Sequence, residues 1–282
     1  MTTRHSPLAT RHSPLACQLL IDPPADGAWN MAVDEVLLAA AAGGRCLLRF
    51  YRWQPPTLSL GYFQALDDRR RHAASLGCPV VRRASGGGAI VHDREITYSV
   101  ALPSDHPLAI GRMRLYQTVH QTLIEVLADA GVRAELYRQE PQQAKCACPF
   151  LCFQRRAAGD VVVGTVKVAG SAQRRLQGAV LQHGSVLLGR SAAAPELDGL
   201  RELSGTSLPE DPLIEAWVDR LSHRLEMTWQ RQPLTDRQRA EAAELARRKY
   251  AAEAWTMWRG RERIADNFPR AVMGSAGPGC VE

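Results

Sequence analysis

Residues 167–175, Lys-Val-Ala-Gly-Ser-Ala-Gln-Arg-Arg, are followed downstream by residues 181–185, Leu-Gln-His-Gly-Ser. The first segment has a strand pattern that runs into a glycine and a serine, and Cys152 lies fifteen residues before its lysine. A thiol, a lysine and a glycine-rich backbone are the groups needed to pass an acyl chain through a thioester. The stretch therefore predicts a strand of a sheet with an acyl-transfer site beside it.

The sequence around this stretch predicts a mixed α/β fold. Residues 160–163 and 166–168 flank Gly164 and predict a hairpin, and residues 180–188 predict another strand. Further strand patterns cover residues 46–51, 57–60, 79–82 and 96–102. Helical patterns cover residues 28–42, 67–76, 115–130, 212–227 and a segment from an N-cap at Thr235 to 252. We expect an α/β (α+β) domain with a mixed β-sheet flanked by helices, and a small helical C-terminal part at residues 210–258.

The two ends of the chain have a different character. Residues 3–9, Thr-Arg-His-Ser-Pro-Leu-Ala, recur at residues 10–16 without helical or strand period. This predicts a flexible leader over residues 1–16, or a start site placed too early. Residues 267–282 are rich in glycine, proline and small side chains and predict a flexible tail. Residues 17–258 then form one domain, which suits a chain of 282 residues.

Composition narrows the class of protein. Hydrophobic residues make up 45% and charged residues 23% of the chain, which is typical of a globular protein. No apolar run is long enough to predict a membrane span. Seven cysteines without a regular framework predict free thiols in a reducing cytoplasm. The net charge of +6 favours an acidic protein partner over nucleic acid, because the basic residues are scattered and no aromatic-interleaved basic motif occurs.

A glycine loop follows the strand at residues 79–82. Its sequence is Arg82-Arg-Ala-Ser-Gly-Gly-Gly-Ala-Ile-Val-His-Asp93. Three successive glycines let backbone N–H groups approach a ligand without a Cβ in the way, and arginines bind phosphate or carboxylate groups. Three glycines alone would indicate only a hairpin, and the spacing fits neither a Walker loop nor a dinucleotide fingerprint. The whole set predicts a binding loop with these contacting residues: Arg82, Arg83, Ser85, Gly86, Gly87, Gly88, His92 and Asp93.

Residues 167–175 and 181–185 supply the second half of the expected site. Lys167 is interpreted as a lysine aimed at the acyl carbonyl that also favours the thiolate form of a neighbouring cysteine. Solvent-facing lysines are the commoner case. We expect the backbone and side chains of Gly170, Ser171, Ala172, His183 and Gly184 to contact the acyl group. For His183 alone, a structural role is at least as common as a catalytic one.

Three cysteines lie close together, in Cys146-Ala-Cys-Pro-Phe-Leu-Cys152. A structural zinc site needs about four ligands, usually in paired sets, and no second half lies nearby. We therefore expect no metal, and we interpret Cys146 and Cys148 as ordinary loop or core cysteines. Cys152 would be interpreted in the same way without the lysine and glycine loop.

Together these motifs resemble the lipoate–protein ligase A / octanoyltransferase family, which shares its catalytic fold with biotin protein ligases. Asn30-Met-Ala-Val-Asp-Glu35 is similar to the family's first helix. The resemblance covers residues 17–258 and also includes residues 48–64, 82–93, 167–175, 181–188 and the pairs Lys249-Tyr250 and Ala254-Trp255. It implies a biotin/lipoyl protein ligase-like catalytic domain.

Within that family the resemblance implies an octanoyltransferase acting in protein lipoylation. LipM-type transferases carry a catalytic cysteine in a Cys-Phe pair upstream of Lys-x-x-Gly-Ser-Ala, and Cys152-Phe153 matches this placement. The implied donor is octanoyl-acyl carrier protein, and the implied acceptor is a lysine of a lipoyl domain or glycine cleavage H protein. Cys152 and Lys167 are then the catalytic residues, and no cofactor is needed.

Two alternatives remain open at this point. An ATP-dependent lipoate–protein ligase would need ATP and Mg²⁺, and would use Arg82 and the glycine loop to hold an acyl-adenylate. Gly86-Gly-Gly88 stands where many LipM-type transferases have Gly-Gly-Arg, and this departure favours the ligase. A non-enzymatic carrier-binding module is the other alternative, and the retention of Lys167 and the loop argues against it.

Overall fold

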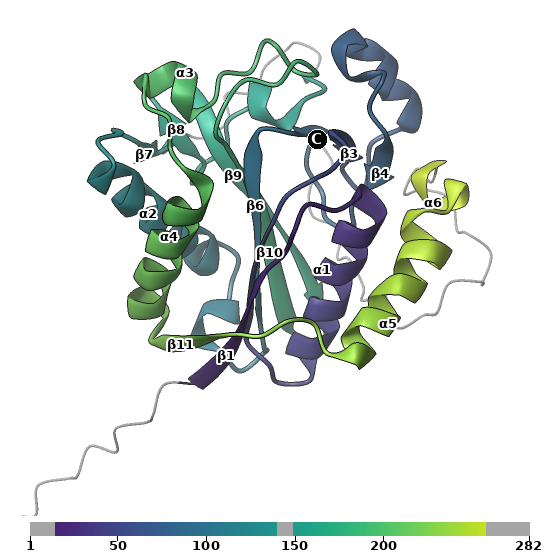
Figure 1. Cartoon of the computed structure of the whole chain (residues 1–282), viewed down its shortest axis with the longest axis vertical. Helices are drawn as coiled ribbons and strands as arrows, with labels where there is room; N and C mark the ends of the chain where they lie inside the picture. The colour runs from purple at the N-terminus through teal and green to yellow at the C-terminus, as the bar shows by residue number, and fades with distance from the viewer. Residues whose placement is uncertain (1–14, 140–148, 258–282) are drawn as a thin grey trace, which may run out of the picture.

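The computed structural model of this chain describes residues 15–139 and 149–257. Within them an eight-stranded mixed sheet has the order β11-β1-β2-β6-β10-β9-β8-β7 (Figure 1). Its strands are β1 (Leu15–Ile21), β2 (Leu47–Tyr51), β6 (Glu95–Leu102), β7 (Glu135–Leu136), β8 (Val161–Val163), β9 (Val166–Leu176), β10 (Ala179–Leu187) and β11 (Met227–Arg231). This confirms the predicted fold class.

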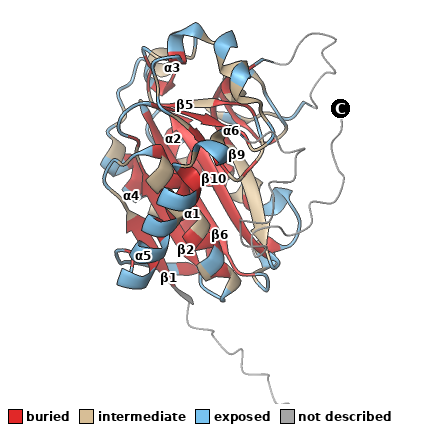
Figure 2. Cartoon of the chain, turned by 90° about the vertical axis from the view of Figure 1, so that its right-hand side faces the viewer, coloured by how far each residue is buried: buried red, intermediate tan, exposed pale blue. Residues whose placement is uncertain are grey.

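Helices cover both faces of this sheet. Helices α1 (Gly27–Ala42) and α5 (Asp236–Leu245) lie on one face, and α2 (Met113–Asp129) and α4 (Glu210–Leu225) lie on the other (Figure 1). Each pair buries its own apolar cluster against the strands, so the sheet is the most deeply buried layer (Figure 2). Burial of apolar surface in these two layers is the main favourable term that holds the sheet in place. Two shorter α-helices are α3 (Leu200–Ser204) and α6 (Glu253–Met257), and a π-helical turn at Ala246–Tyr250 follows α5.

A small three-stranded sheet carries the glycine loop. Its order is β4 (Val80–Arg82), β3 (Thr57–Leu60) and β5 (Ile90–His92), with β3 parallel to β4 and antiparallel to β5. The loop at residues 83–89 therefore leaves the end of β4 and returns into β5. Positive φ at Gly87 (97°) is a conformation that favours glycine and turns the chain back.

The register of the central strands sets where residues 167–175 and 181–185 lie. Strand β10 pairs antiparallel with both β6 and β9, which places His183 between Ser99 and Ala172. Lys167 lies on the first part of β9, opposite Val162 of β8. Residues from the hairpin and from the glycine loop can therefore meet above the same end of the sheet.

Two predictions of secondary structure from the sequence are wrong. The segment at 67–76, predicted as one helix, forms two 3₁₀ helices, Leu66–Arg71 and Ala73–Ser75. No residue of the first is buried, so no apolar stripe exists to stabilise a regular α-helix. The helix predicted to reach Met227 ends at Leu225, where Glu226 has positive φ, and Met227 begins β11. Because β11 pairs with β1, the C-terminal part also adds a strand to the main sheet.

The boundaries elsewhere follow the prediction in part. The N-cap at Thr235 is confirmed, since its side chain accepts a hydrogen bond from the Gln238 amide. Strand β9 runs to Leu176, well beyond the predicted end of the hairpin at residue 168. Strand β1 begins at Leu15, so residues 15 and 16 of the expected leader belong to the sheet. Residues 1–14, the predicted tail, and Cys146 and Cys148 lie outside the described residues. Among the helices of the described segments, none is long and apolar enough to cross a membrane.

Candidate active site

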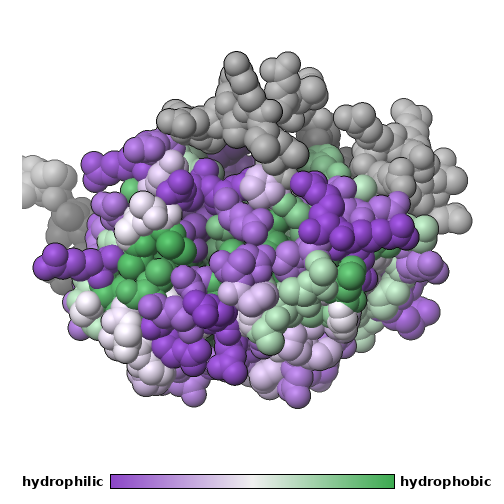
Figure 3. All heavy atoms as spheres, turned by 90° about the horizontal axis from the view of Figure 1, so that it is seen from above, coloured by the Kyte–Doolittle hydropathy of each residue, from purple (hydrophilic) through white to green (hydrophobic). Residues whose placement is uncertain are grey.

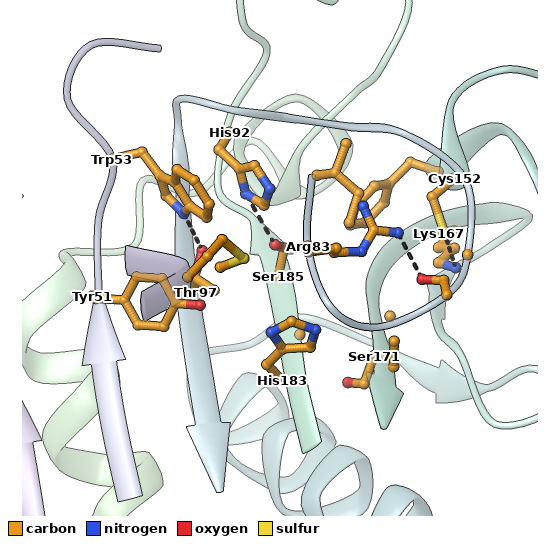
Figure 4. A pocket seen from close by; sticks show the side chains of 18 residues that line it. Tyr51, Trp53, Arg83, His92, Thr97, Cys152, Lys167, Ser171, His183 and Ser185 are labelled. Atoms are coloured by element: carbon orange, nitrogen blue, oxygen red, sulfur yellow. Dashed lines mark hydrogen bonds between the residues drawn. The ribbon is translucent and has the colours of Figure 1, made fainter. Parts of the chain in front are cut away.

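A narrow pocket opens between the glycine loop and the central strands, with a cavity volume of about 50 Å³. Figure 4 shows Cys152 and Lys167 on one side of Arg83, and Tyr51 and Trp53 on the other. Of the residues expected to form the site, the pocket is lined by Arg83, Gly86, Gly87, His92, Cys152, Lys167, Gly170, Ser171, Ala172, His183 and Gly184. Arg82, Ser85, Gly88 and Asp93 are not part of its lining.

Cys152 and Lys167 meet at one side of this pocket. The Lys167 Nζ lies 3.9 Å from the Cys152 Sγ, and 5.4 Å from the centre of the Phe153 ring (Figure 4). The lysine is only 6% exposed. A buried ammonium next to a sulfur stabilises negative charge on that sulfur, because the surroundings screen the interaction weakly.

The glycine loop fixes the backbone at Cys152. The Cys152 amide donates a hydrogen bond of 2.7 Å to the Ala89 carbonyl, and Ala89 donates to Phe150. A Cβ on Gly88 would lie 3.0 Å from the Cys152 nitrogen and 3.1 Å from its Cα. Gly88 therefore acts through close backbone packing, which places the thiol at the pocket without direct contact with a ligand.

Asp160 is a site residue that the sequence analysis missed. Its Oδ2 forms an ion pair of 2.8 Å with Lys167 Nζ and accepts a hydrogen bond from the Ala157 amide. Its Oδ1 accepts a hydrogen bond of 2.6 Å from the Tyr116 hydroxyl, and burial together with Asp160 raises the pKa of Tyr116 well above its usual value. The carboxylate thus fixes the direction of the lysine side chain. In the sequence, Asp160 is a single acidic residue before three valines, and this pattern gives no signal of a role beside Lys167.

A buried polar cluster continues from Asp160 towards Ser171. The Ser171 hydroxyl is within 2.6 Å of the Tyr98 hydroxyl and 2.7 Å of His120 Nε2, and His120 Nδ1 lies 2.6 Å from the Gly159 carbonyl. Burial lowers the pKa of His120 to about 4. The imidazole is therefore neutral near pH 7, and it fixes Ser171 in the pocket wall without adding charge.

Lowering the pH is expected to destabilise the fold through His120. The unfolded chain protonates this ring at its ordinary pKa of 6.5, whereas the folded chain does so only at about 4. Its contribution to stability is therefore fully present above pH 6.5 and is lost as the pH falls towards 4. This shift corresponds to about 3 kcal/mol. Urea unfolding of the wild type and His120→Gln at both ends of this range measures it, and an equal pH dependence in the two proteins would contradict the assignment.

The two neighbouring arginines differ in position, because Arg83 lines the pocket and Arg82 does not. The Arg83 guanidinium donates hydrogen bonds to the carbonyls of Ser59, Gly86 and Gly88, and so holds the glycine loop in shape. Burial lowers the pKa of Arg83 to about 10, which still leaves it charged near pH 7. It faces the pocket, whereas Arg82 faces away from it.

The structure gives no support to the ligand-contacting role expected for Arg82, which is not part of the pocket lining. Its side chain is fully buried and donates to the carbonyls of Gly61, Gln64 and Thr256. The Trp255 indole in turn donates to the Arg82 carbonyl. With its donors directed at backbone oxygens, Arg82 joins the small sheet to α6.

Arg82→Ala is expected to destabilise the protein by about 3 kcal/mol, because several buried carbonyls lose their donors together. Denaturant unfolding measures this change. Arg70→Ala, at an exposed position, serves as the control and should change stability by less than about 0.5 kcal/mol. Equal effects of the two substitutions would contradict the bracing role.

Of the other predicted residues, His92, His183 and Gly184 line the pocket, whereas Ser85 and Asp93 lie outside its lining. His183 bonds Asp34 through Nδ1 at 2.9 Å and the Ser85 hydroxyl through Nε2, so Ser85 acts behind the histidine. His92 stacks on Trp53 with ring centres 3.9 Å apart and bonds Glu95 at 2.6 Å. The other two predicted residues have fixed surroundings: Asp93 accepts a hydrogen bond from Ser191, and Gly184 has no room for a Cβ beside Ser171.

Asp34 connects the histidine wall to the core. Besides His183 it bonds Arg49 at 3.0 Å, Tyr51 at 2.9 Å and Ser99 at 2.9 Å. Burial opposes its ionisation, but the His183 hydrogen bond and the charge of Arg49 outweigh it and lower the pKa of Asp34. A charged, fully bonded carboxylate holds His183 in one orientation. Within the described residues no cluster of histidine, cysteine and carboxylate groups has the arrangement of a metal site.

Comparison with solved structures supports the same fold. A T. acidophilum protein assigned as a lipoate protein ligase, with bound lipoic acid, has a TM-score of 0.71 and 22% identity, and the match covers 86% of this chain and 100% of that one. A lipoate-protein ligase A bound with ATP has a TM-score of 0.68 and 22% identity, with coverage of 86% and 99%. Both likenesses concern the fold alone.

Sequence comparison reaches further. Octanoyltransferase LipM of Brevibacillus brevis is 34% identical over 262 residues, which cover 82% of this chain and 95% of the relative. Octanoyltransferase LipM of Kyrpidia tusciae is 34% identical over 271 residues, which cover 84% and 97%. The family model described as lipoyl protein ligase A/B catalytic domain matches residues 26–195. This chain, with its pocket between the glycine loop and the β9–β10 hairpin, belongs to the lipoyl protein ligase A/B catalytic domain family.

Proposed function

We propose that this protein is an octanoyltransferase of protein lipoylation that carries the octanoyl group as a thioester on Cys152. The observation that supports it most is the approach of Lys167 Nζ to within 3.9 Å of the Cys152 Sγ at a narrow pocket. The names of the relatives, which are octanoyltransferases at 34% identity over most of the chain, point to the same reaction.

The first half of the proposed reaction loads the enzyme. The Cys152 thiolate attacks the carbonyl carbon of octanoyl-acyl carrier protein, and a new C–S bond forms as the tetrahedral oxyanion develops. Lys167 and the backbone amides of Gly86, Gly87 and Gly170, which line the pocket, stabilise that charge. The oxyanion then collapses, the bond to the donor sulfur breaks, and the carrier leaves as a thiol after it takes a proton.

The second half transfers the group to an acceptor protein. The neutral ε-amine of a lysine on a lipoyl domain or glycine cleavage H protein attacks the Cys152 thioester. An amide bond forms, the C–S bond breaks, and the Cys152 sulfur leaves as a thiolate that the Lys167 ammonium stabilises. The proton lost by the amine passes to solvent. No nucleotide takes part in either step.

The surface of the protein suits partners that bind and leave. The net charge of +6 favours encounters with acidic carrier and acceptor proteins. The end of the molecule that carries α3 and β3 shows mostly hydrophilic side chains with apolar groups between them (Figure 3). Such a mixed surface is typical of transient protein–protein contacts.

A transfer assay without ATP tests this proposal. The protein is incubated with octanoyl-acyl carrier protein and then with a lipoyl domain, and all three proteins are weighed intact by mass spectrometry. We expect one octanoyl group on the enzyme first and then on the acceptor. Acceptor labelling that requires ATP and free octanoate or lipoate would instead establish a ligase.

A further inference from the structure

A second and larger cavity lies behind the active-site pocket. Its volume is about 560 Å³, and it lies between α1, α5 and the strands β9 and β10, with the exposed Ala39 and Glu241 at its open side. Apolar side chains make up most of its lining, among them Val36, Leu38, Leu181 and Leu245. Charged residues also line it: Asp34, Glu35, Arg174, Arg175, Glu241 and Glu244. Glu35 is paired with Lys249 at 2.6 Å. A cavity of this kind favours an apolar occupant.

Two residues, Met31 and His183, line both cavities and therefore stand between them. His183 is held by hydrogen bonds to Asp34 and Ser85 on its two ring nitrogens. Met31 is 3% exposed and has no polar partner to fix it. Methionine has three rotatable side-chain bonds and adapts readily to its surroundings. Met31 is thus the adjustable part of the partition, and His183 is the fixed part.

The partition lies away from the reactive thiol. Figure 4 shows Tyr51 on the side of Arg83 opposite to Cys152 and Lys167. Met31, Tyr51 and Trp53 belong to one apolar cluster on the α1 side of the sheet. An acyl chain whose carbonyl carbon is at Cys152 would extend its methyl end through the pocket towards this cluster.

We propose that Met31 sets the upper limit of acyl-chain length by closing the pocket against the larger cavity, which is a latent subsite for the distal carbons of longer saturated acyl chains. This inference rests on the proposed acyl transfer through Cys152. The Met31 side chain keeps the pocket short, and its truncation would join the two cavities. Each added methylene of a longer chain would then be buried in an apolar space.

Chain-length profiles of Met31 variants test the subsite. Octanoyl, decanoyl and dodecanoyl thioesters of the carrier protein are compared by the rate of adduct formation on Cys152, measured by intact mass. Met31→Ala is expected to raise the dodecanoyl-to-octanoyl ratio by about tenfold or more. Met31→Leu, of similar volume, should keep the wild-type ratio. Ala39 lines the larger cavity. When Ala39→Trp is added to Met31→Ala, the indole should fill that cavity and return the dodecanoyl-to-octanoyl ratio to the wild-type value.

The outcomes separate this inference from the proposed function. If wild type forms an octanoyl adduct and Met31→Ala leaves the ratio unchanged, the subsite is wrong and the transfer stands. If wild type forms no adduct, calorimetric binding of free octanoic and dodecanoic acids to wild type and Met31→Ala still tests the cavity. Equal selectivity of the two proteins in that measurement would overturn the inference. Met31→Val carries the same test with a smaller loss of core volume if Met31→Ala is poorly folded.

Discussion

Cys152→Ser is expected to lower octanoyl transfer by roughly 10⁴-fold or more. A hydroxyl at this position is nearly isosteric with the thiol, but near pH 7 it ionises far less readily and is a much weaker nucleophile. The hydrogen bond from the Cys152 amide to the Ala89 carbonyl involves only backbone atoms, so the local fold should persist. The loss then reports the sulfur itself.

Two measurements check this result. Intact mass after incubation with octanoyl-acyl carrier protein should show no adduct on the variant, and transfer to a lipoyl domain should cease. Cys78→Ser is the matched control, because Cys78 is another free cysteine of the described residues and lies outside the pocket lining. A Cys152→Ser protein that still transfers octanoate with ATP would show that the thioester route is not used.

Gly170→Ala is expected to reduce transfer by about 10²-fold. A Cβ at this position would lie 2.4 Å from the Lys167 Cε, 2.6 Å from its Nζ and 3.1 Å from the Asp160 Oδ1. The methyl group can therefore be accepted only if the buried lysine moves away from its ion pair with Asp160, at a cost in stability. The new position would separate the ammonium from the Cys152 sulfur.

This prediction is tested by measuring both the urea unfolding and the rate of Cys152 adduct formation of the variant and the wild type. Gly170→Ala should remain folded without urea, unfold at a somewhat lower urea concentration than wild type, and form the Cys152 adduct far more slowly. Gly77→Ala is the control, since a Cβ there meets no atom within 4 Å. A Gly170→Ala protein with wild-type adduct formation would show that the lysine position does not matter. A large loss of stability would instead mean that the strand cannot accept the methyl group.

Local sequence signals predicted most of the elements because hydrophobic periodicity acts over a few residues. The helix at Met113–Asp129 and the strand at Glu95–Leu102 both show it, and the N-cap at Thr235 was visible from its own side chain. The exceptions are segments whose partners are distant. Strand β11 depends on pairing with β1, more than two hundred residues earlier, and β5 depends on β3.

The candidate site divides in the same way. The sequence by itself supplied the chemical groups: a cysteine, a lysine, a glycine loop and two histidines, in an order that resembles one enzyme family. Only the tertiary structure decided their geometry. It placed Asp160 and Tyr116 behind Lys167, turned Arg82 towards α6, and left Met31 between two cavities. The physical reason is that side-chain contacts between distant segments follow from strand order and helix packing, which no local pattern encodes.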